Sequence, residues 1–584
     1  MTTNPMHGNG NGNDDMGKAM DNGAYDVPVL IVGGGPVGLC GALLLARYGV
    51  RSLLVERHPG TSIQPKARGI NARTMELLRT WGLEDQVRVA GAPLVGNSLL
   101  LWTESLAGKE LRRIQTAPGD DAVAAFLATI SPTTGGGCTQ NAFEPILLAA
   151  ARQHPEADIR FNTELVALEQ DATGARATIR DRVHGGETVV TARYVVAADG
   201  VHSPVRHLLG IPVNLLSAPN RILNIYFRAN LTPFVAERKF IWCIVRNETV
   251  SGLMLTSDLP DHWLFNVPLG PDETADTYDA ERTLAAIRAA VGVADVDVEI
   301  LGVQEYTITA AVAARYREGK VFLVGDAAHV MPPAGAFGMN TGIQDMHNLA
   351  WKLAAVVSGW ASADLLDSYE AERLPVGRET VTRAARRSDA MGLMGAGRPS
   401  PAAQPQRMPQ GPGMPLEGEN ARDAITLGYA YASRAVSGGP LASDDPIPAE
   451  MPHGAHVGYR APHLWITENG QRRSTLDLFE GSYTLLTGPD GAGWLAAGRE
   501  TAAVLPVPLR CAGLAPAGDL TDDAGMWDAT YGLPRDAAVL VRPDGFIAWI
   551  GPHAADADAI ALRAALEETL GAAPAPVSSS SSRG

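Results

Sequence analysis

A cluster of glycines between two apolar segments constrains the fold of this chain most strongly. Residues 27–32 have the apolar character of a strand buried in a parallel sheet, and residues 36–48 are predicted to form a helix. Glycines between them permit a tight turn, in which the backbone can approach a pyrophosphate at the helix N-terminus. This order predicts a βαβ unit that binds an adenine dinucleotide. The residues of the predicted turn are Gly33, Gly35, Pro36, Val37 and Gly38.

An acidic residue closes the second predicted strand of the same unit. Residues 50–56 form a largely apolar segment that ends at Glu56. A carboxylate at that position can accept hydrogen bonds from an adenosine ribose. The glycine turn and Glu56 therefore indicate an adenine dinucleotide, but they do not distinguish FAD from NAD.

A second glycine-rich segment, much further along the chain, makes that distinction. A predicted strand at 320–324 ends at Gly325-Asp326, where a carboxylate can bind a polyol such as the ribityl chain of a flavin. Glycines in residues 332–338 let the backbone approach a flat ring. The residues predicted to contact the flavin here are Asp326, Pro333, Gly335, Gly338, Met339 and Asn340.

A helix is predicted after this loop, at 342–358. Thr341 and Gln344 have the spacing of a capping box, which marks the start of a helix. The N-terminus of a helix carries partial positive charge, and this charge favours an anionic reduced flavin. We therefore predict FAD as the bound dinucleotide.

Charge and cysteine usage exclude several other classes of protein. The formal net charge is −16, whereas nucleic-acid binding requires a concentrated basic surface. The cysteines contain no CxxC pair, so the sequence predicts neither a metal site nor a disulfide framework. The absence of a signal-peptide pattern and of a long apolar run predicts a cytoplasmic protein without a membrane partner. The four cysteines are Cys40, Cys138, Cys243 and Cys511.

A length of 584 residues predicts several domains, because a single core of that size is rare. The predicted organisation is a disordered tail at 1–25, a FAD-binding domain in two parts at 26–210 and 316–392, a substrate-binding sheet domain at 211–315, a linker with connecting helices at 393–454, a small α/β domain at 455–573 and a second disordered tail at 574–584.

Aromatic residues are interleaved through the middle of the chain, where the pattern predicts a sheet lying over the nucleotide domain. Its predicted strands are 222–228, 239–246, 252–256 and 262–268, followed by a helix at 281–291. In the last domain the predicted strands are 482–487, 503–506 and 538–542, the last of which enters a hairpin at Pro543-Asp544-Gly545.

With these motifs the chain resembles the class A FAD-dependent aromatic hydroxylases, the p-hydroxybenzoate hydroxylase type. The resemblance rests on the two glycine-rich segments and on Asp199-Gly200-x-x-Ser203-x-x-Arg206. Residues 65–76 and the C-terminal domain are similar to the aromatic-polyketide hydroxylases of actinomycetes, such as the tetracenomycin-type oxygenases. The resemblance implies a Rossmann-like FAD domain of the glutathione-reductase type, an overlying β-sheet substrate domain and a C-terminal thioredoxin-like domain without CxxC.

The family also implies roles for individual residues. Asp199 and Gly200 would support contact with both FAD and NAD(P)H. A basic residue would face the FAD phosphates, and the register leaves Lys66 and Arg68 open for this role. The two further residues implied to lie against FAD are Gln140 and, near the adenosine, Arg57.

The implied activity is that of a monooxygenase. NADPH, or NADH, would reduce FAD, and O2 would add to form a C4a-hydroperoxide whose distal oxygen is attacked by a phenol ring. The implied substrate is a polycyclic aromatic phenol or quinone of the polyketide type, in antibiotic biosynthesis. The resemblance is compatible with a monomer or a homodimer.

Tyr226 is the candidate catalytic residue, because its hydroxyl can hydrogen-bond a phenolate and assist its deprotonation. Arg228, Trp242 and Trp263 lie on the same predicted sheet. Each of the four side chains can instead pack between the sheet and the FAD domain, and the sequence leaves the two roles open.

Three other functions are compatible with parts of the sequence. An antibiotic-inactivating hydroxylase would use the same chemistry in a resistance role. A non-catalytic flavin-binding accessory protein would retain the FAD motifs. A flavin halogenase typically carries a WxWxIP segment and an essential lysine, and this chain has no such segment.

Overall fold

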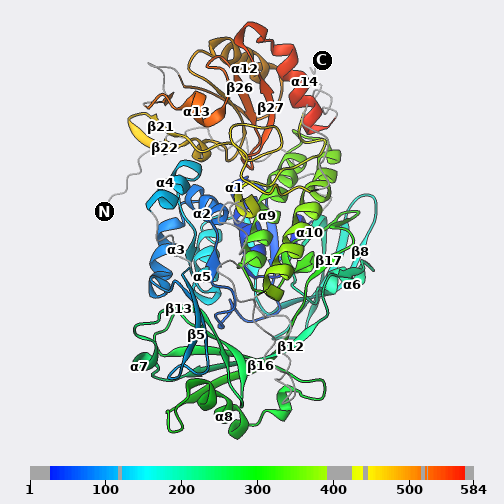
Figure 1. Ribbon diagram of the computed structural model, residues 1–584. Helices are drawn as coiled ribbons and strands as arrows, with labels where there is room; N and C mark the ends of the chain where they lie inside the picture. Colours follow the sequence, from blue (N-terminus) through cyan, green and yellow to red (C-terminus); the bar gives the residue numbers. More distant parts are fainter. Residues whose placement is uncertain are drawn as a thin grey trace, which may run out of the picture.

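The computed structural model describes residues 26–115, 121–390, 424–437, 445–514, 520–522 and 524–571. Figure 1 shows an elongated molecule, with a parallel sheet and its helices in the middle, a second sheet at one end and the C-terminal domain at the other. The predicted tails at 1–25 and 574–584, and much of the predicted linker at 393–454, lie outside the described residues.

The middle of the molecule is built on an eight-stranded sheet with a parallel centre. β1 pairs with β2 on one side and with β10 on the other, and β10 pairs with β19. The two glycine-rich segments follow β1 and β19, so this order brings them to the same edge of the sheet. The strands are β18 (Arg317–Glu318), β19 (Val321–Leu323), β10 (Glu187–Ala197), β1 (Val27–Val32), β2 (Ser52–Val55), β7 (Ala157–Arg160), β8 (Thr163–Gln170) and β9 (Ala175–Asp181).

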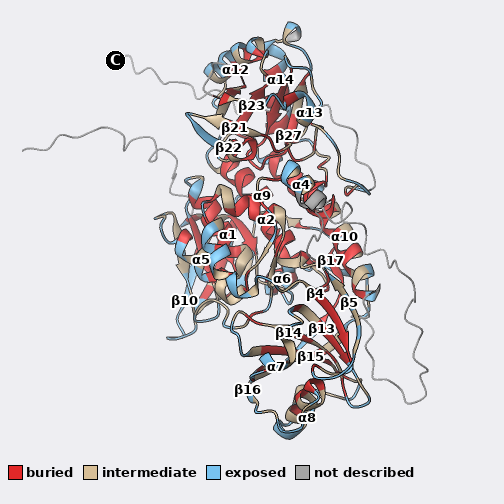
Figure 2. Cartoon of the chain, turned by 60° about the vertical axis from the view of Figure 1, so that its left-hand side comes forward, coloured by how far each residue is buried: buried red, intermediate tan, exposed pale blue. Residues whose placement is uncertain are grey.

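Helices pack against this sheet and confirm the predicted α/β class. α1 contacts both α5 and α9, and α9 is buried without interruption from Asn340 to Val356 (Figure 2). The helices are α1 (Pro36–Arg47), α2 (Ala72–Thr80), α3 (Glu84–Ala90), α4 (Asp121–Ile130), α5 (Gln140–Ala151), α6 (Pro204–Leu208), α9 (Phe337–Val357) and α10 (Asp367–Ala390). The short strands beside them are β3 (Gly69–Ile70), β6 (Gly136–Gly137), β11 (Val213–Leu215), β17 (Ala311–Ala313) and β20 (His329–Val330).

The second sheet has seven strands. Two of them form a hairpin that lies within the predicted FAD-binding domain at 26–210. β4 and β5 come from the segment assigned to the first part of the FAD domain, yet β4 pairs with β13 of the second sheet. Strand pairing between distant segments leaves no local pattern, so the boundary at 211 could not include them. In spatial order the strands are β16 (Glu299–Ile308), β12 (Asn220–Arg228), β15 (His262–Pro268), β14 (Ser251–Thr256), β13 (Phe240–Arg246), β4 (Leu99–Thr103) and β5 (Glu110–Gln115).

The two faces of this sheet have different neighbours. Leu223, Ile225 and Phe227 of β12 belong to a core that includes Ile287 of α8 (Ala280–Val291). On the opposite face, Ala334 of the second glycine-rich segment packs against Leu100, Trp102 and Ile244. Alternate residues of each strand therefore face the parallel-sheet domain, as the pleat of a strand requires. We call this the inner face; α7 (Thr232–Val235) lies beside the sheet.

The C-terminal domain contains the four-stranded sheet and flanking helices of the predicted thioredoxin-like fold. β23 is parallel to β24 and antiparallel to β26, which forms a hairpin with β27 around the predicted turn. The strand prediction at 503–506 is wrong. Its first two residues end α12, and Pro506 and Pro508 precede the real strand, β24. The elements are β21 (Trp465–Glu468), β22 (Gln471–Ser474), β23 (Tyr483–Thr487), α12 (Ala492–Val504), β24 (Leu509–Gly513), β25 (Leu520–Thr521), α13 (Trp527–Tyr531), β26 (Ala538–Val541), β27 (Ile547–Gly551) and α14 (Ala559–Leu570).

The described residues contain neither a membrane-spanning helix nor a metal-binding cluster. Within these ranges, none of the helices combines the length and apolar character needed to cross a bilayer. The same residues contain no group of three or more histidine, cysteine or acidic side chains arranged to hold a metal ion. All four cysteines are free thiols.

Candidate active site

The turn between β1 and α1 has a shape that only glycine allows at two positions. Gly33 has a φ of +108°, and a Cβ there would lie 2.3 Å from the carbonyl oxygen of Ala198. A Cβ on Gly38 would lie 1.9 Å from the carbonyl oxygen of Gly33. No side chain caps the start of α1 at Gly35, so its first N–H groups remain available to an anion. This cradle fits the pyrophosphate of a dinucleotide.

The structure brings the two glycine-rich segments into contact. Val37 of the first turn lies against Gly325 and Gly342, and a Cβ on Gly342 would approach the Val37 side chain to 2.7 Å. Pro36 occupies the first position of α1, where its missing N–H removes no helix hydrogen bond. The predicted pyrophosphate and ribityl sites are therefore neighbours, as one bound FAD requires.

Glu56 holds the glycine turn through its carboxylate. It accepts hydrogen bonds from the Gly34 N–H at 2.6 Å and from the His58 N–H at 2.8 Å. Its side chain is 12% exposed, and the neighbouring Arg57 is exposed. Contact of these two residues with an adenosine stays a prediction.

Asp326 follows β19 and lies in the wall of a cavity of about 190 Å³. Solvent reaches its carboxylate, but surrounding protein atoms desolvate it and raise its pKa. Gly325, with a φ of +59°, turns the chain just before it, and the Gly325 N–H donates to Asp345 at 3.1 Å. Arg206 and His329 lie in the same cavity wall. The carboxylate is thus accessible and fixed by its backbone, as a ribityl acceptor must be.

The loop before α9 differs from the predicted start of that helix. α9 begins at Phe337, so Thr341 and Gln344 lie inside it and do not form a capping box. Ala336 precedes the helix in the left-handed conformation, with a φ of +56°, and no side chain caps the helix start. The N–H groups of the first turn can therefore face a ligand. Pro333 is exposed, whereas Gly335, Gly338 and Met339 are half-buried.

Asn340 ties this loop to the start of α2. Its buried amide accepts a hydrogen bond from the Asn71 N–H at 3.0 Å and donates to the Gly69 carbonyl at 2.9 Å. It also donates to the Ala336 carbonyl at 2.6 Å. We call residues 331–340 the flavin loop. Asn340 therefore supports this loop from within the protein in the structure, and its contact with FAD stays a prediction.

The basic residues predicted to face the FAD phosphates have different environments. Lys66 is exposed. The Arg68 guanidinium donates to the Ile241 carbonyl at 3.0 Å and to the Thr256 carbonyl at 2.5 Å, and desolvation lowers its pKa to about 10. Arg68 thus links the flavin domain to the second sheet, which leaves Lys66 as the more available cation. Gln140 starts α5 and donates to Glu144 at 2.6 Å.

The Asp199-Gly200 pair lies where β10 ends and α6 begins. The Asp199 carboxylate accepts from the Ser203 hydroxyl at 2.6 Å and from the Val205 N–H at 3.0 Å, and burial raises its pKa. Gly200 has a φ of +84°, which favours glycine. The pair therefore shapes the turn after β10, and its contact with nucleotides stays a prediction.

Cross-strand pairing places Tyr226 on the inner face of the second sheet. Tyr226 lies opposite Leu264, which lies opposite Leu255, and Leu255 lies opposite Trp242. Residues directly opposite one another share a face, so Tyr226 and Trp242 both face the flavin domain. Desolvation and the nearby Asp258 raise the pKa of Tyr226.

The other two residues considered with Tyr226 lie elsewhere. Trp263 is 4% exposed in the core on the opposite face, and its indole N–H donates to the Ala229 carbonyl at 3.0 Å. Arg228 is exposed at the end of β12 and forms an ion pair with Glu299. Both faces of the sheet carry apolar side chains. The alternation of residues along the strands therefore could not show, from the sequence alone, which side chains lie on the inner face.

Sequence reasoning missed two asparagines on the inner face. Asn224 and Asn266 are direct cross-strand neighbours, and the amide oxygen of each is buried without a hydrogen-bond partner among the described residues. The same holds for Asn141 in the first turn of α5, whose amide nitrogen donates to Asp258 at 3.1 Å. Asparagine in an otherwise apolar strand was the available clue.

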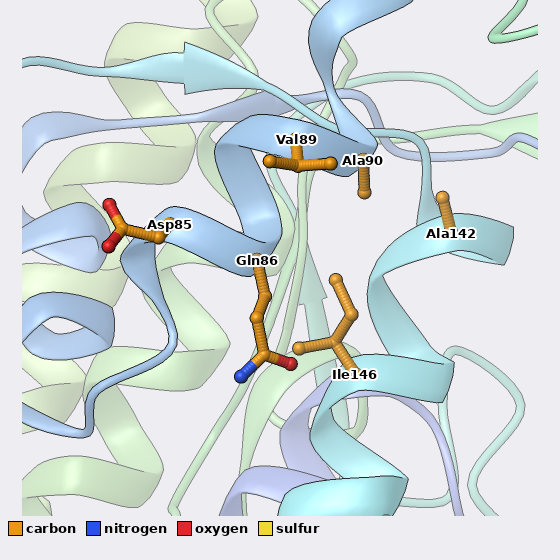
Figure 3. A pocket seen from close by; sticks show the side chains of 6 residues that line it. All are labelled: Asp85, Gln86, Val89, Ala90, Ala142 and Ile146. Carbon is orange, nitrogen blue, oxygen red and sulfur yellow. The ribbon is translucent and has the colours of Figure 1, made fainter.

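The surface also has a hollow between two helices. It is a shallow apolar depression between α3 and α5, lined by Asp85, Gln86, Val89, Ala90, Ala142 and Ile146 (Figure 3). None of the predicted site residues lines it.

Comparison with known proteins agrees with this geometry. Residues 26–384 match the family described as FAD binding domain, and residues 454–573 match the aromatic-ring hydroxylase C-terminal family. The chain belongs to the FAD-dependent aromatic-ring hydroxylases. The hydroxylase therefore has the predicted family and class of enzyme.

The alignments with individual relatives extend over nearly the whole hydroxylase. It is 44% identical to a putative polyketide hydroxylase of Streptomyces halstedii, with 90% of this chain and 93% of the relative covered. It is 39% identical to the tetracenomycin A2 monooxygenase-dioxygenase of Streptomyces glaucescens, with 93% and 97% covered. A solved ternary complex of aklavinone-11 hydroxylase with FAD and aklavinone matches with a TM-score of 0.79 at 34% identity, with 94% and 99% covered.

Proposed function

We propose that this hydroxylase is an NADPH-dependent FAD monooxygenase that hydroxylates a polycyclic aromatic phenol or quinone of the polyketide type, in antibiotic biosynthesis. The observation that supports the proposal most strongly is that the glycine turn, Asp326 and the inner face of the second sheet lie close together. The glycine turn and Asp326 lie at one edge of the parallel sheet, and the inner face of the second sheet covers the flavin loop.

The overall reaction balances with O2 and one reduced nicotinamide. One oxygen atom enters the ring as a hydroxyl group, and the other leaves as water with the two electrons of NADPH and a proton. FAD, when bound, supplies the electron transfer and oxygen activation that protein side chains lack. The chain supplies binding, orientation and exclusion of water.

Several residues would hold FAD in this arrangement. The N–H groups at the start of α1 would bind the pyrophosphate, and Asp326 would accept hydrogen bonds from the ribityl chain. The first turn of α9 would place its positive end against the pyrimidine edge of the ring, which stabilises negative charge there. Lys66 would lie near the phosphates.

Tyr226 would donate a hydrogen bond to the phenol oxygen of the substrate and so favour its phenolate form, because a phenolate ring is the better nucleophile. Its raised pKa keeps its own hydroxyl protonated at neutral pH, so it would act as a hydrogen-bond donor to the phenolate. The unpartnered amide oxygens of Asn224 and Asn266 would accept hydrogen bonds from further substrate hydroxyl groups.

The test is NADPH oxidation by the purified flavoprotein with a panel of aromatic compounds. We expect strong stimulation by a polycyclic phenol, weak stimulation by single-ring phenols, and incorporation of one atom of labelled oxygen from O2 into the product. Product formation in the absence of O2 would contradict the proposal. Selective stimulation by a single-ring phenol would contradict the substrate class and retain the reaction.

The role of Tyr226 is tested by Tyr226→Phe. Loss of the hydrogen bond to the phenolate is expected to slow hydroxylation about 100-fold while FAD remains bound. The matched control is Tyr278→Phe, a tyrosine packed against the core on the opposite face of the sheet. Unchanged turnover in Tyr226→Phe would assign Tyr226 to packing.

A further inference from the structure

The turn of the β26–β27 hairpin is buried, although hairpin turns normally lie on the surface. The Arg542 N–H donates to the Phe546 carbonyl at 2.8 Å and closes the turn. Arg542 is 0% exposed and Asp544 is 1% exposed. Two charged side chains at such depth need partners, because an unpaired buried charge is strongly destabilising.

The partners come from the long helices of the flavin domain. The Arg542 guanidinium donates to both carboxylate oxygens of Glu372 on α10, at 2.6 and 2.9 Å, and to Asp544 at 3.0 Å. Asn348 of α9 donates to Asp544 at 3.2 Å and to Glu372 at 2.6 Å. Lys352, one turn further along α9, donates to Glu372 at 2.6 Å. The turn is therefore bonded to both α9 and α10.

One chain of contacts leads from the turn through α2 to the flavin loop. Arg73 of α2 donates to the carbonyl oxygen of Asp544 at 2.8 Å. Asn71 precedes α2, and its side chain caps the helix by accepting from the Thr74 N–H at 2.9 Å. The Asn71 N–H donates in turn to Asn340, in the first turn of α9.

A second chain of contacts leads to the segment that carries Asp326. Phe546 stacks on Tyr431 with ring centroids 4.1 Å apart, and the Tyr431 hydroxyl accepts a hydrogen bond from Arg373 at 3.1 Å. Arg373 donates to Asp345 at 2.7 Å. Asp345 accepts from the N–H of Gly325, the residue before Asp326. Every side chain in this series is buried.

We infer that the buried turn at 542–546 of the C-terminal domain positions the flavin loop and Asp326, and so sets how FAD is held. The inference rests on the flavin site of the proposed function. The two chains of contacts hold the flavin loop and the segment that carries Asp326 in place. This matters because small displacements of the groups that contact a ligand weaken its binding. Arg542 and Asp544 are positioning residues that act through α2, α9 and Arg373.

Titration of the apoprotein with FAD, followed by flavin fluorescence, tests this role. Asp544→Asn removes the charge that Arg542 and Asn348 contact, and we expect the Kd for FAD to rise about tenfold. Tyr431→Phe keeps the stack on Phe546 and removes only the acceptor for Arg373, so the Kd should rise about threefold. The absorbance spectrum of the bound flavin should shift in both variants.

Arg47→Gln is the matched control. Arg47, at the end of α1, forms a two-point ion pair with Glu480 of the C-terminal domain at 2.7 and 2.9 Å, and neither residue belongs to the two chains of contacts described above. Its Kd for FAD should stay within about twofold of wild type, whatever its thermal stability.

Wild-type Kd values and flavin spectra in both test variants would overturn the inference while leaving the flavin assignment intact. If Asp544→Asn does not fold, Tyr431→Phe decides alone, because a single buried hydroxyl is removed there. Failure of the wild-type protein to bind FAD would overturn the proposed function, and this inference with it.

Discussion

Two turns in this molecule support the flavin site in opposite ways. The turn between β1 and α1 works through shape: Gly33 and Gly38 leave no room for side chains, and bare N–H groups face the ligand. The turn between β26 and β27 works through charge, because Arg542 and Asp544 are fully buried and paired. The first can be recognised from its own residues, whereas the second depends on what the fold places around it.

The largest expected effect on FAD binding is at the turn that works through shape. In Gly33→Ala the new Cβ would meet the Ala198 carbonyl at 2.3 Å, at a φ that disfavours alanine. We expect FAD affinity to fall at least about 100-fold, since strain and a shifted backbone add together. Equilibrium dialysis against FAD measures it. Gly60→Ala, with no atom within 4 Å of the new Cβ, is the control, and equal losses in both variants would refute the steric argument.

A substitution in the turn that works through charge is expected to lower the free energy of unfolding of the protein. Arg542→Met leaves Glu372 and Asp544 buried with fewer partners, which should cost about 3–5 kcal/mol in the free energy of unfolding. Urea denaturation gives this value. The control is Arg563→Met in the same domain, where an exposed pair with Glu567 at 2.8 Å contributes about 0.5 kcal/mol or less. A loss no greater than that of the control would show that the buried pairs do not support the turn.

Asp326→Ala tests a direct contact with FAD, and it leaves both turns unchanged. Removing the carboxylate leaves the Gly325 N–H and its bond to Asp345 in place, so folding should persist. FAD affinity should fall about tenfold, the value of one charge-assisted hydrogen bond. Flavin content of the purified variant measures the loss, with the exposed Asp158→Ala as control. Full occupancy of Asp326→Ala by FAD would mean that the ribityl chain binds elsewhere.

The contrast between the turns also explains what the sequence could predict. The four strands predicted at 222–268 agree with β12 to β15 within about two residues, because strand patterns and turn residues are local. The start of α9 was misplaced because Ala336, a residue with no cap side chain, begins it in the left-handed region. Local patterns therefore located elements well and their irregular ends poorly.

The sequence could not show which polar side chains are buried by segments that lie far away along the chain. Asp345, Asn348 and Lys352 recur on α9 at helical spacing and resemble a solvent-exposed polar stripe. In the structure all three are buried against α10 and the C-terminal hairpin. The same limit applies to Trp263, which no local pattern could assign to one face of a sheet that is apolar on both sides.

The stability of the protein is expected to depend on pH through a histidine beside the buried charged turn. Burial, together with the neighbouring Arg73, lowers the pKa of His347 to about 3, from an ordinary value of 6.5. Between these two values the unfolded chain binds a proton that the folded chain does not. Stability is therefore fully present above about pH 6.5 and falls as the pH drops toward 3, by up to about 1.4 kcal/mol per pH unit for each such histidine.

His463 in the C-terminal domain has a pKa lowered to about 3 for the same reason, so His347→Gln should remove one of two contributions. Urea midpoints measured between pH 5 and 7 isolate the histidines, because most carboxylates of the unfolded chain are ionised there. We expect a shallower slope in His347→Gln and an unchanged slope in the exposed His184→Gln. Equal slopes in all three proteins would show that the environment of the charged turn does not exclude protons from His347. That result would weaken the contrast between a turn made by shape and a turn made by charge.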